Sequence, residues 1–297
     1  MRAFITGASG WIGTAVTDEL IANGHQVIGL ARSDASAASL EGKGAEVLRG
    51  DLDDLDALRT GSQRADAVIH LANKHDWSDQ AGTNRTERAA VQTIGDTLVG
   101  TGKPFLVAAG VAGLTPGRPA TEADPNPSHG PDAPRGGTEN LALEFAEHGV
   151  VPVSLRFAPS VHGAGDHGFV KIIADADRRA GSAAYIGDGE HRWAAVHVRD
   201  AARAVRLGLE QATPGLVLHI VAEAGVPTKA IAEAIGGADG LPVESIDPAA
   251  AQEHFGFMGM FFGMDLSASS TRTQEVLGWT PTGPTLVEDI ASGGYAA

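Results

Sequence analysis

The chain of 297 residues contains no cysteine, which excludes disulfides, thiolate catalysis and thiolate metal ligands. It also lacks any apolar run near the roughly 20 residues that a membrane span requires, and a strand is predicted so close to the start that no signal peptide is expected. Basic residues are few, with 22 Lys and Arg against 37 Asp and Glu and a formal net charge of -15. Nucleic acid and anionic membranes would repel such a chain. We therefore expect a cytoplasmic protein whose partner is a small molecule or a second copy of itself.

The first segment of the chain has the pattern of a strand, a tight turn, a helix and a second strand. The apolar run RAFI is followed by Gly7, Gly10 and Gly13 with the spacing G-x-x-G-x-x-G. Apolar residues then recur with helical period as far as Gly24, before the second apolar run QVIGLA. A glycine turn lets the backbone approach a pyrophosphate, and the free N–H groups at the start of the next helix favour its charge. The segment therefore predicts a dinucleotide-binding turn.

The end of the second strand distinguishes between the two nicotinamide cofactors. An acidic side chain at this point would pair with the ribose hydroxyls of NAD, whereas the segment LARSD has Arg32 and Ser33 where a 2′-phosphate would lie. We therefore expect NADP(H) rather than NAD(H). The alternative is a solvated Arg32 at a strand end, with Asp34 capping the next helix and contributing nothing to the cofactor.

Apolar runs and helical stretches go on alternating along the chain. Strands are predicted in AEVLRGDLDD, ADAVIHLAN, GKPFLVAAG and VVPVSLRFAPS, with helices near residues 54–62, 85–101 and 136–148 between them. This alternation is typical of an α/β fold with a parallel, doubly wound sheet, which binds ligands beyond the carboxyl ends of its strands. The predicted cofactor-lining residues are Gly7, Ser9, Gly10, Trp11, Ile12, Gly13, Arg32, Ser33, Asp51, Leu52, Leu71, Ala72, Asn73, Ala108, Ala109, Phe157, Ala158 and Pro159.

These motifs resemble those of the extended branch of the short-chain dehydrogenase/reductase superfamily, which includes the nucleoside-diphosphate-sugar epimerases and dehydratases. The matching segments are TGASGWIG, GDLDD, VIHLAN, LRFAPSVHG, VHVRDAARAV and STRTQEVLGWTP, and they span nearly the whole chain. The resemblance implies an NAD(P)-binding Rossmann domain at residues 1–158 plus 197–222. It also implies a smaller α/β substrate domain at residues 159–196 plus 223–297, and a homodimer joined through the last two of the three predicted helices.

The family's catalytic residues are missing from this chain. Its members carry a Ser after the fifth strand and a Tyr-x-x-x-Lys pair on the next helix, where Tyr transfers a proton to or from the substrate oxygen while Lys binds the ribose and lowers the Tyr pKa. Matching Glu144 to the Glu common in that helix puts Gly136 at the Tyr position and Asn140 at the Lys position. LVAAGVAG has Ala where Ser is expected. The resemblance is therefore to an atypical member, in which Asn140 remains as a candidate cofactor contact.

Three side chains are candidates to replace the missing catalytic groups. A guanidinium at Arg135, beside the vacant Tyr position, would stabilise an oxyanion or bind a carboxylate. The alternative for Arg135 is an exposed ion pair with Glu139, one helical turn further on. His162 and His167 follow the sixth strand, on the loop expected to pass the nicotinamide. An imidazole transfers protons near neutral pH, although loop histidines are more often simply solvated.

Four residues are candidate substrate contacts. His75 follows the fourth strand, where the alternative is a polar loop over the cofactor, and the resemblance puts Arg192 where relatives bind a substrate phosphate. Phe257 and Phe261 lie in the Phe- and Met-rich segment FGFMGMFFGMD. That segment predicts a lid over an apolar substrate, a dimer interface or ordinary core packing of the small domain, and the sequence leaves these three open. No metal site is predicted, because the two loop histidines lack a third ligand at suitable spacing.

Three functions are consistent with the sequence. The favoured one is an NADP-dependent oxidoreductase that uses His or Arg in place of Tyr and reduces a small carbonyl, imine or activated alkene. The second is a non-redox protein that binds NADP(H) as a sensor or structural element. The third is a lyase, isomerase or epimerase that uses the same pocket.

Overall fold

The computed structural model describes residues 1–74, 76 and 78–295. The chain divides into two compact units. The first unit comprises Met1–Ala109, Pro125–Arg156 and Ala202–Leu218, and the second comprises Gly110–Asp124, Phe157–Ala201 and His219–Ala297.

The segment Gly110–Asp124 belongs to the second unit, whereas the sequence assigns it to the nucleotide-binding domain. Backbone hydrogen bonds explain the difference. The Val111 amide donates to the Phe157 carbonyl at 3.1 Å, and the Ala120 amide donates to the Ser267 carbonyl at 3.0 Å. Residues far along the chain therefore bind a segment that directly follows a strand of the first unit.

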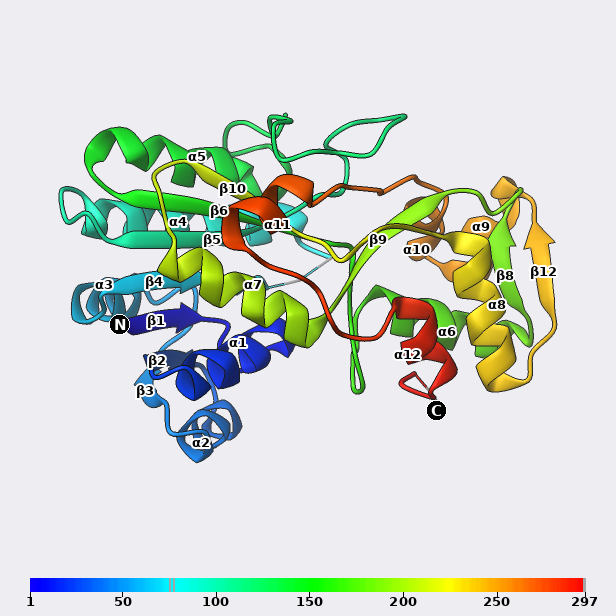
Figure 1. Ribbon diagram of the computed structural model, residues 1–297, viewed down its shortest axis with the longest axis horizontal. Coiled ribbons are helices and arrows are strands. Elements are labelled where there is room, and N and C mark those ends of the chain that lie inside the picture. Colours follow the sequence, from blue (N-terminus) through cyan, green and yellow to red (C-terminus); the bar gives the residue numbers. More distant parts are fainter. Residues whose placement is uncertain (75, 77, 296–297) are drawn as a thin grey trace. The chain divides into compact units, whose positions relative to one another are not determined.

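A seven-stranded sheet forms the centre of the first unit (Figure 1), in the order β10-β6-β5-β4-β1-β2-β3. The pairs β1–β2, β2–β3, β1–β4 and β4–β5 are parallel, and the strand order reverses between β1 and β4, which is the usual binding edge of a doubly wound sheet. The predicted fold class is therefore confirmed. The strands are β1 (Arg2–Thr6), β2 (Gln26–Ala31), β3 (Glu46–Arg49), β4 (Ala67–His70), β5 (Pro104–Gly110), β6 (Val151–Phe157) and β10 (Leu216–Ile220).

Helices follow the strands of this sheet, and their apolar faces pack on it. In α3, Asp54 caps the helix by accepting the Ala57 amide at 3.0 Å, and buried Leu58 packs in one core with Phe4 of β1. The stretch predicted as one helix near residues 136–148 is three short helices in the structure. The helices are α1 (Trp11–Ala22), α2 (Asp34–Gly42), α3 (Leu55–Arg64), α4 (Gln80–Leu98), η1 (Pro134–Gly137), α5 (Thr138–Glu144), η2 (Phe145–His148) and α7 (Val198–Glu210).

The second unit contains two small sheets, in the orders β11-β9-β7 and β12-β8. Their strands are β7 (Ser160–His162), β8 (Ala183–Ile186), β9 (Arg192–His197), β11 (Glu223–Pro227) and β12 (Val243–Ile246). The accompanying helices are α6 (Phe169–Ala180), α8 (Thr228–Asp239), η3 (Pro248–Ala250), α9 (Ala251–Phe255), α10 (Met258–Phe262), α11 (Thr271–Leu277) and α12 (Leu286–Ala291). Across the described part of the chain, no helix combines the length and the apolar character needed to cross a bilayer.

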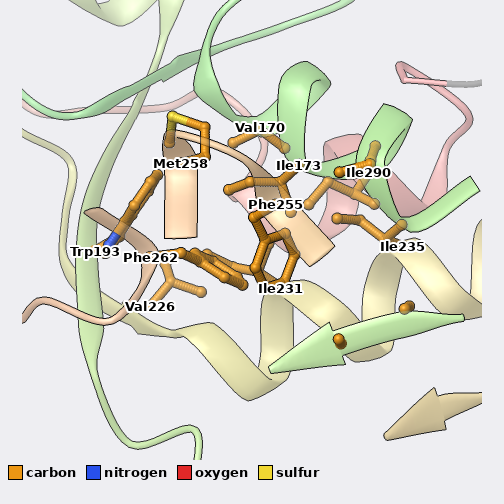
Figure 2. Close-up of a cluster of buried hydrophobic side chains, with 14 of the residues drawn as sticks. Val170, Ile173, Trp193, Val226, Ile231, Ile235, Phe255, Met258, Phe262 and Ile290 are labelled. Atoms are coloured by element: carbon orange, nitrogen blue, oxygen red, sulfur yellow. The ribbon is translucent and has the colours of Figure 1, made fainter. Parts of the chain in front are cut away.

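An aromatic core holds the second unit together. Figure 2 shows Trp193 of β9 beside Met258 and Phe262 of α10, with Phe255 of α9 next to Phe262. Trp193 and Phe262 meet edge to face with 5.4 Å between ring centroids, and Phe255 and Phe262 lie 5.1 Å apart. These four side chains are almost fully buried. Core packing, one of the three roles left open for the Phe- and Met-rich segment, is therefore confirmed for three of its seven Phe and Met side chains, those of Phe255, Met258 and Phe262.

Candidate functional site

The glycine turn after β1 leads into a helix end that has no side-chain acceptor. Gly10 is the N-cap of α1, and the first turn of the helix has neither a capping side chain nor an acidic residue. A Cβ at Gly13 would lie 1.9 Å from the Gly7 carbonyl oxygen, and one at Gly7, whose φ is +73°, would lie 2.8 Å from the Ala72 amide nitrogen. The free N–H groups and dipole of such a helix end attract phosphate. The turn therefore fits the pyrophosphate of a dinucleotide, which these residues and α1 would hold.

Two arginines lie at the carboxyl ends of the neighbouring strands β2 and β3: Arg32 directly follows β2, and Arg49 is the last residue of β3. Arg32 is exposed, and it has no hydrogen bond or ion pair with any other described residue. Arg49 donates from Nη1 to the Ser33 carbonyl at 2.7 Å and forms an ion pair with Asp34. Ser33, rather than Asp34, caps α2, so the alternative in which Asp34 is the cap is wrong. The sequence reasoning missed Arg49, although the parallel register of the two strands could have pointed to it.

The other predicted cofactor contacts lie near strand ends or at the start of α1. The Asp51 carboxylate accepts the Asp53 and Asp54 amides at 2.9 and 3.1 Å, so it closes a turn, and the Leu71 amide donates to the Thr6 carbonyl at 3.1 Å. Within the first unit the remaining candidates are Ser9, Trp11, Ile12, Leu52, Ala72, Asn73, Ala108 and Ala109. Phe157, Ala158 and Pro159 belong to the second unit.

Arg135 forms an ion pair with Glu87, which projects from α4. Its Nε donates to Glu87 Oε2 at 3.3 Å and its Nη2 donates to Oε1. Glu87 is 1% exposed and also accepts a hydrogen bond from Asn73, whereas the Arg135 side chain is 37% exposed. The alternative of an ion pair between Arg135 and Glu139 is wrong, because α5 begins only after Arg135. Glu139 is buried and pairs instead with Arg156, at 2.6 Å from Nε.

Asn140, at the vacant Lys position, is held by a loop of the first unit. Its Nδ2 donates to the carbonyl of Asn126 at 3.1 Å and to that of Ser128 at 2.7 Å. Because an amide group has two N–H donors, these two bonds use both of them. The side chain therefore anchors the loop that precedes η1.

Buried His70, on β4, was missed by the sequence reasoning. Its Nδ1 lies 2.9 Å from Thr6 Oγ1, and its Nε2 has no partner among the described residues. Burial and, to a smaller extent, the positive charge of Arg135 lower the pKa of His70 to about 3. The imidazole is therefore neutral at physiological pH. The alternation of VIHLAN places His70 on the same face of the strand as Val68, which was the available signal for its burial.

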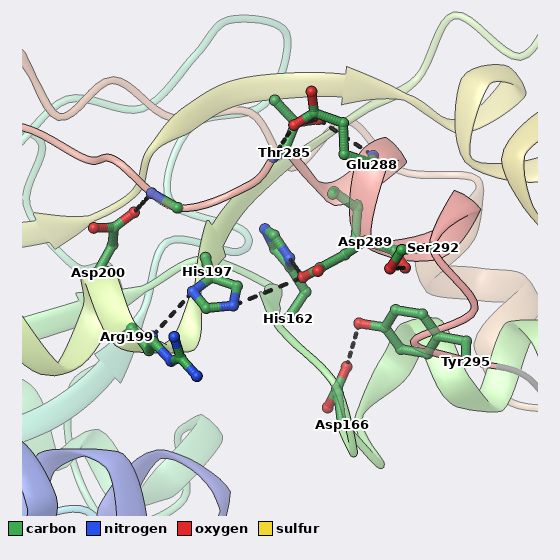
Figure 3. A network of polar contacts seen from close by, with 12 residues as sticks. His162, Asp166, His197, Arg199, Asp200, Thr285, Glu288, Asp289, Ser292 and Tyr295 are labelled. Atoms are coloured by element: carbon green, nitrogen blue, oxygen red, sulfur yellow. Dashed lines mark hydrogen bonds and ion pairs between the residues drawn. The ribbon is translucent and has the colours of Figure 1, made fainter.

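His162 lies inside a polar network of the second unit (Figure 3). Its Nδ1 is 2.6 Å from Asp289 Oδ2 and its Nε2 is 3.9 Å from Glu223 Oε1. The ring of His197 stands edge to face with that of His162, and His197 Nε2 is 4.0 Å from the same Asp289 oxygen. Burial lowers the pKa of His162, although Asp289 acts in the opposite direction. Because His162 is 0% exposed, none of its ring atoms is accessible to solvent within its unit.

His167 and its neighbour Asp166 have opposite environments. His167 is exposed, whereas Asp166 is buried and accepts hydrogen bonds from the Tyr295 hydroxyl at 2.8 Å (Figure 3) and from the Gly168 amide at 2.7 Å. Burial raises the pKa of Asp166. His162, which was expected on a loop, is the last residue of β7 and lies inside the unit, whereas His167, on the loop that follows, is exposed.

Arg192 lines a cavity of about 440 Å³ in the second unit. Glu223, Gly225, Ser267 and Pro119 are among the other residues of its wall. Burial raises the pKa of Glu223. The cavity therefore has one cationic and one acidic side chain on its wall.

The two predicted Phe contacts in the Phe- and Met-rich segment differ in exposure. Phe257 is 46% exposed, and Met260 and Met264 are exposed near it in sequence. Phe261 is partly buried and stacks on Phe169, with 6.0 Å between ring centroids. His75, the fourth predicted substrate contact, lies outside the described residues.

Comparisons with known proteins show the family and the fold of the chain. The model of the NAD dependent epimerase/dehydratase family matches residues 3–222. An uncharacterized protein of Schizosaccharomyces pombe is 42% identical over 296 residues, which cover 99% of this chain and 100% of that protein. The 4-hydroxy-2-methyl-3-oxo-4-farnesyl-3,4-dihydroquinoline-1-oxide ketoreductase of Stigmatella aurantiaca is 26% identical over 82% of this chain and 75% of that protein. The solved UDP-glucose 4-epimerase of Thermotoga maritima has a TM-score of 0.76 at 23% identity, covering 99% of this chain and 98% of that one, which shows a shared fold.

Proposed function

Because the chain belongs to the NAD dependent epimerase/dehydratase family, we propose that it is an NADP(H)-dependent oxidoreductase that reduces a carbonyl, imine or activated alkene of an apolar small molecule. The observation that carries this proposal is the partly exposed guanidinium of Arg135, backed by buried Glu87, in the segment where family members have Tyr and Lys. An arginine does not give up its proton at neutral pH, but it stabilises negative charge on oxygen. That property suits reduction, in which charge develops on the substrate oxygen, better than reactions that require a base.

The glycine turn, the N-terminus of α1 and Arg135 have distinct roles in this proposal. The bound nicotinamide supplies the hydride. The glycine turn and the N-terminus of α1 bind the pyrophosphate. The N–H groups of Arg135 bind the substrate oxygen as it becomes negative, and the proton that completes an alcohol product comes from water or from an imidazole.

NADP(H) is preferred in this proposal because two cations lie at the carboxyl ends of β2 and β3. Exposed Arg32 has no partner among the described residues, and Arg49 is held beside it by the Ser33 carbonyl. A 2′-phosphate forms charge-assisted hydrogen bonds with guanidinium groups. Asp34 is the one nearby carboxylate on α2 that opposes this charge, and Arg49 already pairs with it.

The substrate is apolar in this proposal because of two findings. One relative is a ketoreductase whose named substrate carries a farnesyl chain and a 3-oxo group. The second unit also exposes Phe257 with Met260 and Met264, side chains that suit an aliphatic or aromatic ligand. We retain Phe257, Phe261 and Arg192 as proposed substrate contacts.

Of the two candidate histidines, His167 is the better candidate for a proton donor in contact with substrate. It is exposed, whereas His162 has no exposed atom within its unit and is bonded to Asp289. His162→Ala and His167→Ala, assayed separately for turnover with saturating NADPH, test the proposal that an imidazole takes part. Wild-type rates in both variants would exclude it.

The proposed function is tested by following NADPH absorbance with a panel of apolar ketones, 3-oxo esters, imines and enones. Oxidation with any member of the panel supports a reductase. Tight NADPH binding with no oxidation favours the non-redox sensor, and conversion of a substrate without net change in NADPH favours a lyase, isomerase or epimerase. The homodimer stays a prediction from the family resemblance, which the mass of the protein in solution would test.

A further inference from the structure

Arg135 lies in a left-handed backbone turn at the point where family members continue as a helix. The backbone angles φ and ψ are 54° and 24° at Arg135, 64° and 19° at Gly136, and 63° and 29° at Gly137. Left-handed residues normally occur singly, and glycine adopts this conformation far more easily than other residues. Among the described residues, Arg135 is the one non-glycine with positive φ. A strained residue of this kind persists only where its surroundings hold it, and such residues cluster at functional sites.

One face of α4 holds the turn in place. Asn84, Glu87 and Arg88 have the spacing i, i+3 and i+4, which places them side by side on a helix. Asn84 Nδ2 donates to the Ala133 carbonyl at 3.3 Å, and Arg88 Nη1 donates to the Gly136 carbonyl at 2.7 Å. A Cβ at Gly136 would lie 2.7 Å from the Asn84 carbonyl oxygen. The turn is therefore pressed against α4 in a position that excludes a Tyr at residue 136.

The ion pair with Glu87 leaves part of the Arg135 guanidinium available. An arginine has five N–H donors, and Glu87 accepts two of them, from Nε and Nη2. The other three have no partner among the described residues. The Glu87 carboxylate is buried and also held by Asn73, so the plane of the guanidinium is set by a rigid support.

We propose that Glu87 is a positioning residue. Glu87 is held by Asn73, the left-handed turn fixes the backbone of Arg135, and the ion pair between the two side chains orients Arg135. The free N–H donors of Arg135 then bind the substrate oxygen as negative charge develops. This inference rests on the proposed function and names the device that replaces Tyr and Lys. Donors fixed in advance cost no reorganisation when the charge appears, which is why such groups account for large rate effects. Neutral His70 nearby adds no second positive charge to the site.

The test compares three variants with the wild type: Arg135→Ala, Glu87→Gln and the double variant. Glu19→Gln is the matched control, because Glu19 is also a carboxylate, partly buried, that pairs with an arginine in the first unit. Each protein is assayed for kcat and KM with the best carbonyl substrate of the panel, and for NADPH affinity by fluorescence titration. Arg135→Ala and the double variant are assayed again with millimolar guanidinium chloride.

The expected result is a loss in kcat of about 10²- to 10³-fold in Arg135→Ala and of about 10- to 100-fold in Glu87→Gln. NADPH affinity stays unchanged in both, and Glu19→Gln keeps the wild-type kcat. Guanidinium restores activity to Arg135→Ala but not to the double variant, because the added ion binds to the Glu87 carboxylate. A purely structural role for Glu87 would not make rescue depend on it.

Two different results separate the two proposals. Wild-type protein that binds NADPH but oxidises it with no carbonyl overturns the proposed function. If the wild-type protein does turn over a carbonyl substrate, the reductase function stands. An unchanged kcat in Arg135→Ala then overturns the role of Arg135 and with it that of Glu87. Guanidinium rescue of the double variant as strong as that of the single variant overturns the positioning role of Glu87 alone.

Discussion

Gly13 is a position at which one added methyl group should strongly weaken nucleotide binding. The Cβ of Gly13→Ala would lie 1.9 Å from the Gly7 carbonyl oxygen, a backbone atom that cannot rotate away. Since real Cβ contacts are essentially never shorter than 3.0 Å, α1 must move by at least 1.1 Å (3.0 − 1.9) relative to the turn. An N–H to phosphate bond that starts near ~2.9 Å is broken by such a displacement.

The size of the effect follows from the bonds that are lost. Hydrogen bonds to charged groups contribute about 1.5–3 kcal/mol each. Losing one or two of them costs about 2–5 kcal/mol, which raises the Kd for NADPH about 30- to 4,000-fold. The matched control is Gly42→Ala near the end of α2, where no atom lies within 4 Å of the new Cβ, so this variant should bind NADPH normally.

Fluorescence titration with NADPH measures both Kd values, and thermal melting by circular dichroism shows that each variant is folded. The expected result is a folded Gly13→Ala protein with weak binding, together with wild-type binding by Gly42→Ala. Folded Gly13→Ala protein with the wild-type Kd would refute the assignment of this turn to the pyrophosphate.

Three other predictions concern specificity, stability and pH. Arg32→Ala and Arg49→Ala should each raise the Kd for NADPH about 10- to 100-fold through lost charged hydrogen bonds and leave the Kd for NADH unchanged. An equal rise in the Kd for both cofactors would argue against a 2′-phosphate site. Glu139→Gln should lower the free energy of unfolding in urea by about 3–5 kcal/mol, because it leaves the Arg156 charge buried without a carboxylate. Arg59→Ala, at an exposed pair with Asp56, should cost under about 1 kcal/mol, and equal losses in the two variants would contradict this. The pKa of His70 is lowered to about 3 from the ordinary 6.5, so unfolding takes up a proton between pH 6.5 and pH 3, and stability should fall as the pH drops through this range. The urea midpoint of His70→Gln should decline less steeply over the same range. A decline as steep as that of the wild type would show that His70 does not titrate on unfolding.

The fold and the nucleotide-binding turn could be predicted because their signals are local. The spacing of Gly7, Gly10 and Gly13 and the alternation of apolar runs with helical stretches depend on neighbouring residues alone. The strand order β3-β2-β1-β4-β5-β6 then follows the usual rule for doubly wound sheets. The Phe- and Met-rich segment was correctly recognised as a candidate for core packing, yet its division into a buried and an exposed side required the structure.

The details of the candidate site could not be predicted because they depend on contacts between distant residues. Arg135 and Glu87 are 48 positions apart, and nothing near Arg135 in the sequence points to α4 rather than to Glu139. The left-handed turn also has no simple signature, since the two glycines that permit it look like an ordinary loop. The burial of His162 follows from the pairing of β7 with β9 and from Asp289, which is 127 positions away.

The central claim is hydride transfer to a substrate at a site where Arg135 replaces the missing Tyr and Lys. Its most direct test is a reaction with NADPH that carries deuterium at both nicotinamide C4 positions, followed by mass spectrometry of the organic product. The account predicts one deuterium at the former carbonyl carbon with wild-type protein, and a strongly reduced rate of the same labelling with Arg135→Ala. Absence of deuterium from the product of every substrate that the wild-type protein converts would contradict it.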